Sequence, residues 1–284
     1  MASSQSSLNV DGQAETKRLH SGFLAAAGLI VLFASGCNVT HNSEQFTTPP
    51  STTTLSGNWA FTAPAVQGAP GPLTLNVGFT QGTGETVTGV AHLTGTSCVS
   101  STTGIALTGA IAANNQLTLT SAPFGGSTLS ITGQLAATGK AITNPAWSFS
   151  GGSCAALGAA QIQAQNYADI AGSYTGTFVD SGNNQLAVTA TLTQTTQPDG
   201  NGQFQLSGSA TFPNNPCFTQ SIVTSSDVTG SSLSTTYTDS TSGATITAVG
   251  TFNGDATQLT VTNWQVSGGL CDGDSGTGLL TAPI

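Results

Sequence analysis

The stretch Trp147-Ser148-Phe149-Ser150-Gly151-Gly152-Ser153-Cys154 returns later in the chain as Trp264-Gln265-Val266-Ser267-Gly268-Gly269-Leu270-Cys271. The two stretches align without a gap at one offset, because 264 − 147 = 117 and 271 − 154 = 117. A repeat at a long, fixed spacing indicates that one structural unit is used twice. Each copy consists of an alternating strand-like segment, a Gly-Gly turn and a cysteine that can form a cross-link.

The starts of the two copies also correspond. Leu55-Ser56-Gly57-Asn58-Trp59 opens the first copy and Ile170-Ala171-Gly172-Ser173-Tyr174 opens the second, at an offset of 172 − 57 = 115. Between start and end, apolar residues occupy every second position, which predicts half-buried strands. These segments are 73–79, 105–107, 117–119 and 129–131 in the first copy, and 186–192, 204–206, 246–248 and 259–261 in the second.

Turn-forming Gly, Asn, Asp and Pro separate these segments, and no window has a sustained helical period. We therefore predict an all-β protein with two tandem, homologous, antiparallel β domains at residues 55–165 and 166–284. Seven or eight short strands joined by tight turns can close as a small barrel or pack as a sandwich, and the alternation fits both.

Four cysteines belong to the two copies. Cys98 and Cys154 are 56 residues apart, since 154 − 98 = 56, and Cys217 and Cys271 are 54 apart, since 271 − 217 = 54. Among the three possible connectivities, the same pairing within each copy is the most economical. Zinc sites built from thiolates usually contain closely spaced cysteine pairs, which are missing here. We predict one structural disulfide in each domain.

The charge pattern excludes one class of partner. Charged residues make up only 5% of the chain, and after Cys37 it carries one lysine and ten carboxylates, so 1 − 10 = −9. Nucleic-acid affinity comes mainly from Lys and Arg that neutralise phosphates, so we expect no nucleic-acid partner. Attraction to anionic lipid needs basic clusters too, so any attachment to a membrane must be hydrophobic.

The first 37 residues have the parts of an export signal. Lys17-Arg18 precede the apolar run 23–33, and small residues follow it. Eleven apolar residues are too few to cross a bilayer, which takes about 20. Residues 38–54, rich in Thr, Ser and Pro, are predicted to be a flexible tether.

The end of this signal, Ala34-Ser35-Gly36-Cys37, resembles the lipobox of bacterial lipoprotein precursors. The resemblance implies that Cys37 becomes the lipidated first residue of the mature chain and carries palmitate-type acyl groups that hold it to the membrane. Asn38 after the cysteine implies sorting to the outer membrane in that family. Cys37 is also the odd cysteine once the other four are paired.

Two other segments resemble known families. Gly57-Asn58-Trp59 is similar to the first strand of lipocalin-like and avidin-like ligand barrels, which would make Trp59 and Tyr174 candidates for stacking on a ligand. Cys271-Asp272-Gly273-Asp274-Ser275-Gly276 resembles the nucleophile segment of trypsin-like proteases, with Ser275 as the nucleophile.

We interpret the protease resemblance as a coincidence. The only histidines after the signal are His41, in the tether, and His92, in an alternating segment, and the chain ends nine residues after Ser275. The segment is therefore interpreted as a turn beside a disulfide. Asp272 and Asp274 have the opening spacing of a calcium loop without its closing acid, which leaves at most a loose calcium site and predicts no metal centre.

No phosphate-binding loop, zinc signature or dinucleotide fingerprint is present, so we predict neither a cofactor nor an enzyme. The expected function is a non-catalytic lipoprotein of the cell envelope, with a surface-binding or structural role. The alternative is a β-barrel module that binds a small molecule or a glycan, and a hydrolase is the third hypothesis.

Overall fold

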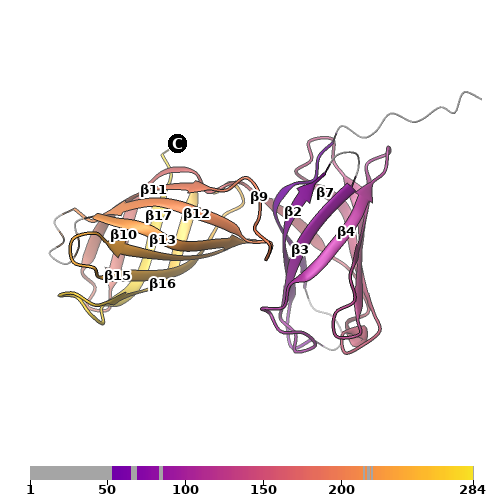
Figure 1. Cartoon of the computed structure of the whole chain (residues 1–284), viewed down its shortest axis with the longest axis horizontal. Helices are drawn as coiled ribbons and strands as arrows, with labels where there is room; N and C mark the ends of the chain where they lie inside the picture. Colours follow the sequence, from indigo (N-terminus) through magenta and orange to yellow (C-terminus); the bar gives the residue numbers. More distant parts are fainter. Residues whose placement is uncertain are drawn as a thin grey trace, which may run out of the picture. The chain divides into compact units, whose positions relative to one another are not determined.

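The computed structural model describes residues 53–64, 69–82, 86–213, 215, 218 and 220–283. Apart from one short 3-10 helix, η1 (Ala155–Leu157), every regular element in these residues is a β-strand. The strands form two antiparallel sheets, one in each half of the chain, and Figure 1 shows the strands of each sheet winding around a common interior. The all-β fold with two antiparallel domains is confirmed, and both domains are barrels rather than sandwiches.

The first sheet contains nine strands in the order β8-β7-β6-β5-β4-β3-β2-β1-β9. Consecutive strands from β1 to β7 pair with each other, while β8 pairs with β7 and β9 pairs with β1. Only Ile162 separates β8 from β9, so one bent strand almost closes the wall. The strands are β1 (Gly57–Ala63), β2 (Leu73–Gln81), β3 (Thr86–Thr94), β4 (Ile105–Ile111), β5 (Gln116–Ser121), β6 (Thr128–Leu135), β7 (Ile142–Ser150), β8 (Ala159–Gln161) and β9 (Gln163–Tyr167).

The second sheet is a closed barrel of consecutive strands, in which β17 pairs with both β16 and β10. Full closure leaves no edge strand in this barrel. Its strands are β10 (Gly172–Asp180), β11 (Gln185–Gln194), β12 (Phe204–Thr211), β13 (Gln220–Thr229), β14 (Ser232–Asp239), β15 (Thr245–Phe252), β16 (Gln258–Ser267) and β17 (Ser275–Thr281).

The alternation in the sequence places the core. In β11, Val188, Ala190 and Leu192 are buried while Thr189 and Thr191 are exposed, as expected for a strand with one face inside a barrel. Each barrel has its own apolar core, and the predicted strand segments all lie within observed strands.

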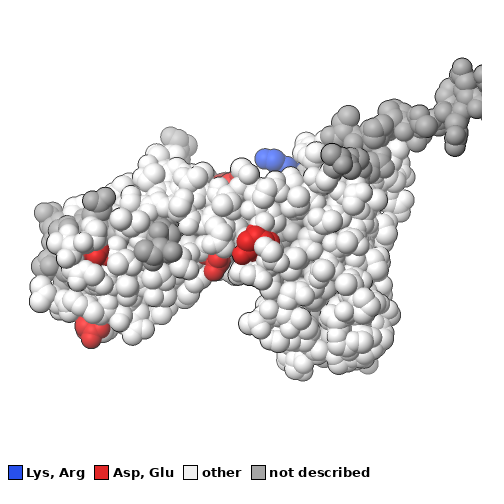
Figure 2. Space-filling model, viewed as in Figure 1, with Lys and Arg blue, Asp and Glu red and all other residues white. Residues whose placement is uncertain are grey.

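The outer surface is almost uncharged. Lys140 is the one lysine or arginine in the described part of the chain, and on the face drawn in Figure 2 charged atoms form only a few isolated groups. Outward positions hold mainly Thr, Ser and Gln, so the surface is polar without being ionic. Within this part of the chain no helix is long and apolar enough to cross a membrane.

The register shows that the two copies match strand by strand. Trp147 in β7 is opposite Ile131, and its repeat partner Trp264 in β16 is opposite Ala248. Both of these strands also contain a bulge, at Asn144-Pro145 in β7 and at Thr262 in β16, where 262 − 145 = 117. The irregularity therefore belongs to the repeated unit.

The repeated Gly-Gly pair has a conformational reason. Gly151 and Gly152 have φ of 70° and 56°, and Gly268 and Gly269 have φ of 81° and 72°. Residues with a Cβ rarely adopt this left-handed region, so both turns require glycine. Each turn directs the chain out of its strand toward a cysteine.

The final strand differs between the copies. The backbone N–H of Ile162 donates to the Pro145 carbonyl oxygen at 3.0 Å, and Pro145 has no N–H to continue the ladder. Beyond this point β9 pairs with β1 alone, whereas β17 pairs with neighbours on both sides past the corresponding bulge.

The connection between the two barrels consists of residues 168–171, and the predicted boundary between residues 165 and 166 falls inside β9. The predicted signal peptide (1–37) and residues 38–52 of the tether lie outside the described residues. Thr53, near the end of the predicted tether, is buried.

Candidate ligand site inside the second barrel

The predicted disulfide of the first domain is present. Cys98, between β3 and β4, is bonded to Cys154, which follows β7, with their Cα atoms 5.1 Å apart. Cys271 is also disulfide-bonded. Cys217, its predicted partner, and Cys37, the predicted lipidation site, both lie outside the described part of the chain, so the Cys217–Cys271 pairing stays a prediction.

Trp59 and Tyr174, the candidates for stacking on a ligand, are core residues. The Trp59 indole Nε1 donates to the Ser56 carbonyl oxygen at 3.2 Å, and the Tyr174 hydroxyl donates to the Ala256 carbonyl oxygen at 2.8 Å. Both side chains are almost completely buried. Burial also raises the pKa of Tyr174 above its ordinary value. Stacking on either ring would need a ligand inside the barrel.

The protease-like segment forms a turn. The Asp272 carboxylate accepts a hydrogen bond from the Gly268 N–H at 2.8 Å, and the Ser275 carbonyl oxygen accepts one from the Ser181 N–H at 3.0 Å. His92 lies on β3 of the first barrel, with its Nδ1 3.3 Å from the Ser101 carbonyl oxygen. Asp272 and Asp274 do not belong to any group of three or more potential metal ligands among the described residues.

Other aspartates also hold turns. The Asp180 carboxylate accepts hydrogen bonds from the Gly182 and Asn184 backbone and from the Asn184 side chain, at 2.7–2.8 Å. These bonds, above all the one from the Asn184 side chain, lower the pKa of Asp180. Asp255 is held by Thr257, whose hydroxyl likewise lowers its pKa.

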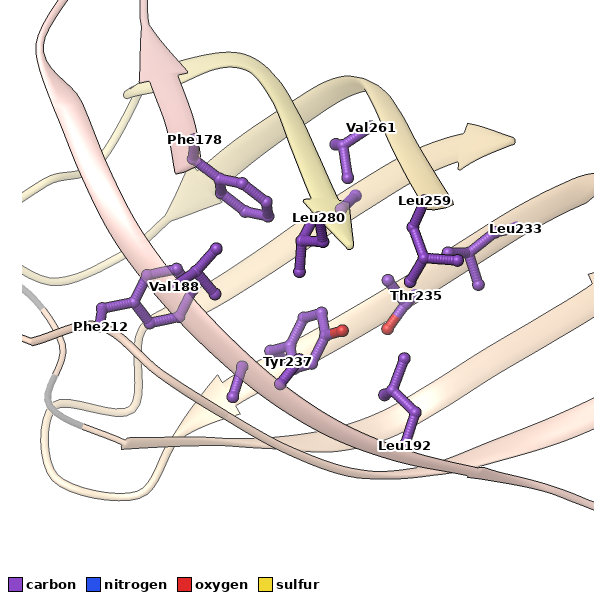
Figure 3. Close-up of a pocket in the computed structure, with 13 residues that line it drawn as sticks. Phe178, Val188, Leu192, Phe212, Leu233, Thr235, Tyr237, Leu259, Val261 and Leu280 are labelled. Carbon is purple, nitrogen blue, oxygen red and sulfur yellow. The ribbon is translucent and has the colours of Figure 1, made fainter. Parts of the chain in front are cut away.

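The interior of the second barrel contains a small cavity of about 20 Å³. Its lining is mostly aliphatic, with Phe178 and Phe212 at one end, as Figure 3 shows. The exceptions are two hydroxyls, those of Thr235 and Tyr237 on β14. This combination of an apolar lining and a few convergent polar groups is typical of small-molecule sites.

One of these hydroxyls belongs to a buried hydrogen-bonded pair. The Thr235 Oγ1 lies 2.7 Å from the Oγ of Ser226 on β13, and Tyr237 is the next buried residue along β14. The Ser226 Oγ is also 2.7 Å from the Ser225 carbonyl oxygen. Burial raises the pKa of Tyr237, so its hydroxyl stays neutral at physiological pH.

Comparison with the first barrel explains the cavity. The repeat fixes the correspondence: Ala248, opposite Trp264, replaces Ile131, and Thr235, opposite Ala248, replaces Leu119. On the other side of the barrel, Ala190 is opposite Tyr174 where Val77 is opposite Trp59. By the same ladders Leu192 replaces Phe79 and Val188 replaces Leu75.

All five substitutions make the middle of the second barrel smaller or more polar. Larger side chains occur toward the ends of the barrel. At one end Phe178 replaces Ala63 and Tyr237 replaces Ser121, and at the other end Phe252 replaces Leu135. The middle layer, which contains the cavity, is therefore smaller and more polar in the second copy than in the first.

The outer wall of the second barrel carries a second hollow. A groove of about 570 Å³ lies over β10, β16 and β17, lined by threonines together with Val179 and Leu279. Leu279 is 47% exposed, and Leu270, beside Cys271, is 88% exposed. Among the described residues, the large apolar side chains that are exposed all belong to this barrel.

Comparison of the chain with protein families, curated proteins and solved structures found no match. The sites described above therefore rest on geometry alone. The sequence analysis missed the interior site, although Leu117-Thr118-Leu119 and Leu233-Ser234-Thr235 carried a signal of it. Aligning them would have shown a core leucine replaced by threonine.

Proposed function

We propose that this chain is a non-catalytic lipoprotein of the cell envelope, attached to the outer membrane through a lipid on Cys37, in which the second barrel is the binding module. The first barrel, which lies between Cys37 and the binding module in the sequence, then has a structural role. The observation that carries the binding role is the smaller, hydroxyl-bearing middle layer of the second barrel.

The substitutions in the middle layer of the second barrel support a binding role over a purely structural one. A cavity and buried hydroxyls both lower stability relative to a filled apolar core. The first barrel supplies larger apolar side chains at the same register positions, so the fold itself does not require the hollow. Features that cost stability without a structural need are typical of functional sites.

The non-catalytic interpretation is supported by what the polar side chains do. The carboxylates of Asp180, Asp255 and Asp272 accept hydrogen bonds that close turns. The two hydroxyls inside the second barrel have no acid or base beside them among the thirteen residues that line the cavity.

Lipidation is tested by metabolic labelling with a palmitate analogue in a bacterial host, comparing the full chain with Cys37→Ser. Labelling of the parent and its loss in the variant are expected, together with release from the membrane fraction. Ser35→Thr serves as a matched control that keeps the cysteine. Equal labelling of parent and Cys37→Ser would refute the anchor.

The groove on the outer wall supports a second candidate, binding of a protein or glycan partner at the surface. It is larger than the interior cavity, and its lining has no ionisable side chain. Leu279→Ser, which changes the exposed apolar side chain, tests this role in pull-downs from envelope extracts, with Thr245→Ser on the same barrel as the control.

A further inference from the structure

We propose that the interior of the second barrel binds a small, uncharged, mainly apolar molecule with one hydrogen-bonding group, which contacts the hydroxyls of Thr235 and Tyr237. This inference rests on the proposed binding function and specifies its ligand. Three observations carry it: the substituted middle layer, the two hydroxyl side chains in the cavity lining and the absence of charge in that lining.

The apolar part of the ligand follows from the lining. Ala190 and Ala248 line the cavity at positions where the first barrel has valine and isoleucine, and Val188 and Leu192 line it in place of larger side chains. Their methyl groups favour an apolar molecule, since each buried CH₂ contributes favourably when it leaves water.

The polar end of the ligand follows from the hydroxyls. Thr235, which is hydrogen-bonded to Ser226, and Tyr237 both line the cavity, and the hydroxyl of each can donate or accept. The lining contains neither an acid nor a base, and a charged ligand would lose its hydration without gaining a counter-charge. A hydroxyl or carbonyl group meets these conditions.

The size of the cavity sets a condition on entry. About 20 Å³ accommodates roughly one or two water-sized groups, so a ring-sized ligand needs additional room. Phe212 borders the cavity, and its ring centroid is 4.7 Å from that of Phe218 and 5.9 Å from that of Phe178. A smaller side chain at Phe212 would enlarge this end without changing the barrel wall.

The test uses the full chain and two probes of the same shape, phenol and benzene. Alanine methyl groups are isotope-labelled, so that binding is located by NMR at Ala190, Ala210 and Ala248, with Ala91 of the first barrel as an internal control. We expect shifts confined to the second barrel and phenol binding at least tenfold tighter than benzene.

Three variants make the test specific. Ala248→Ile restores the first-barrel residue and should abolish binding of both probes, whereas Val249→Ile, on the outer face of the same strand, should leave it unchanged. Phe212→Leu, which also restores a first-barrel residue, should tighten binding. Thr235→Val should weaken phenol binding about tenfold and leave benzene binding unchanged.

Equal affinities for phenol and benzene would overturn the hydrogen-bonding part of the proposal. Absence of binding to both the parent chain and Phe212→Leu would overturn the interior site altogether. In that case palmitate labelling at Cys37 and the Leu279→Ser pull-down would still decide the anchored, surface-binding function independently.

Discussion

The two barrels share a register, a bulge and a turn, yet they differ in how the wall closes and in what fills the middle. In the first barrel the closing strand breaks at Ile162, and the interior is filled by residues such as Leu119 and Ile131. In the second, β17 closes the wall completely, while Thr235 and Ala248 leave a cavity.

This comparison shows that closure and core filling are separate properties of the repeated unit. The wall depends on backbone pairing. The second barrel completes this pairing although the side chains in its middle layer are smaller than those of the first barrel. Backbone pairing and the remaining apolar contacts can therefore hold a barrel whose middle layer has changed. Duplication leaves one copy free to change there while the other keeps the stable interior.

The largest effect is expected from the disulfides, which test whether the two copies are equivalent. The double variant Cys98→Ser with Cys154→Ser should lower the free energy of unfolding of the first barrel by about 4 kcal/mol, because it frees a long loop in the unfolded chain. Cys217→Ser with Cys271→Ser should cost the second barrel about as much. Denaturant titrations followed by NMR signals of each barrel measure both.

A loss in the first barrel only would mean that Cys217 and Cys271 are not joined to each other. Mass mapping of peptides under non-reducing conditions provides the control, since it identifies the partner of Cys271 directly.

The second test exchanges the middle layer. Ile131→Ala in the first barrel should cost about 3 kcal/mol of stability, because it removes buried apolar atoms and leaves a cavity. The reverse change, Ala248→Ile in the second barrel, should stabilise it by about 1 kcal/mol by filling one. Thermal unfolding of the two variants shows whether each substitution lowers or raises the stability of its barrel.

Destabilisation by Ala248→Ile would mean that neighbouring side chains already fill the space that an isoleucine would occupy. The cavity would then not result from the smaller side chain at this position. Ala187→Val, at an exposed position of β11, controls for the effect of a larger side chain on a strand.

These differences mark the limit of what the sequence predicts. The alternation of Leu73, Leu75 and Val77 and the repeated Trp-to-Cys block were enough to predict two β domains and a disulfide between Cys98 and Cys154. Barrel and sandwich could not be separated, because both require the same alternation of buried and exposed positions.

The interior site could not be found from either copy alone. Thr235 taken alone looks like any outward-facing threonine, and its inward position follows only from alignment with Leu119 of the first copy or from its pairing opposite Ala248. The break at Ile162 was equally hidden, since it depends on the pairing of Pro145 with the final strand.

A third test uses pH, because the second barrel has a buried tyrosine where the first has Ser121. The pKa of Tyr237 is raised in the folded chain by burial. Its contribution to stability is therefore complete below the unfolded pKa of about 10, and is lost as pH rises through the folded pKa.

Over that interval the second barrel should lose up to about 1.4 kcal/mol per pH unit, while the first barrel changes less. Unfolding of each barrel at about pH 9 and about pH 11 measures the difference, and Tyr237→Phe should reduce it. If Tyr237→Phe loses as much stability at high pH as the parent chain, the effect belongs to Tyr174, whose pKa is also raised.

The smallest expected effect concerns the two repeated tryptophans. The Trp264 Nε1 donates to the Thr277 carbonyl oxygen on β17 at 3.0 Å, whereas the buried Trp147 Nε1 has no acceptor among the described residues. Replacement by phenylalanine removes the same atoms from both cores. Trp264→Phe should therefore cost about 1 kcal/mol more than Trp147→Phe, the net value of one hydrogen bond.

The difference between these variants isolates the effect of the closing strand, because the loss of volume is common to both. In the first barrel the bent strand does not present a carbonyl oxygen to the indole. Equal costs in chemical denaturation would mean that a buried water satisfies the Trp147 N–H. The two walls would then differ in their path and not in the hydrogen bonding of their repeated tryptophans.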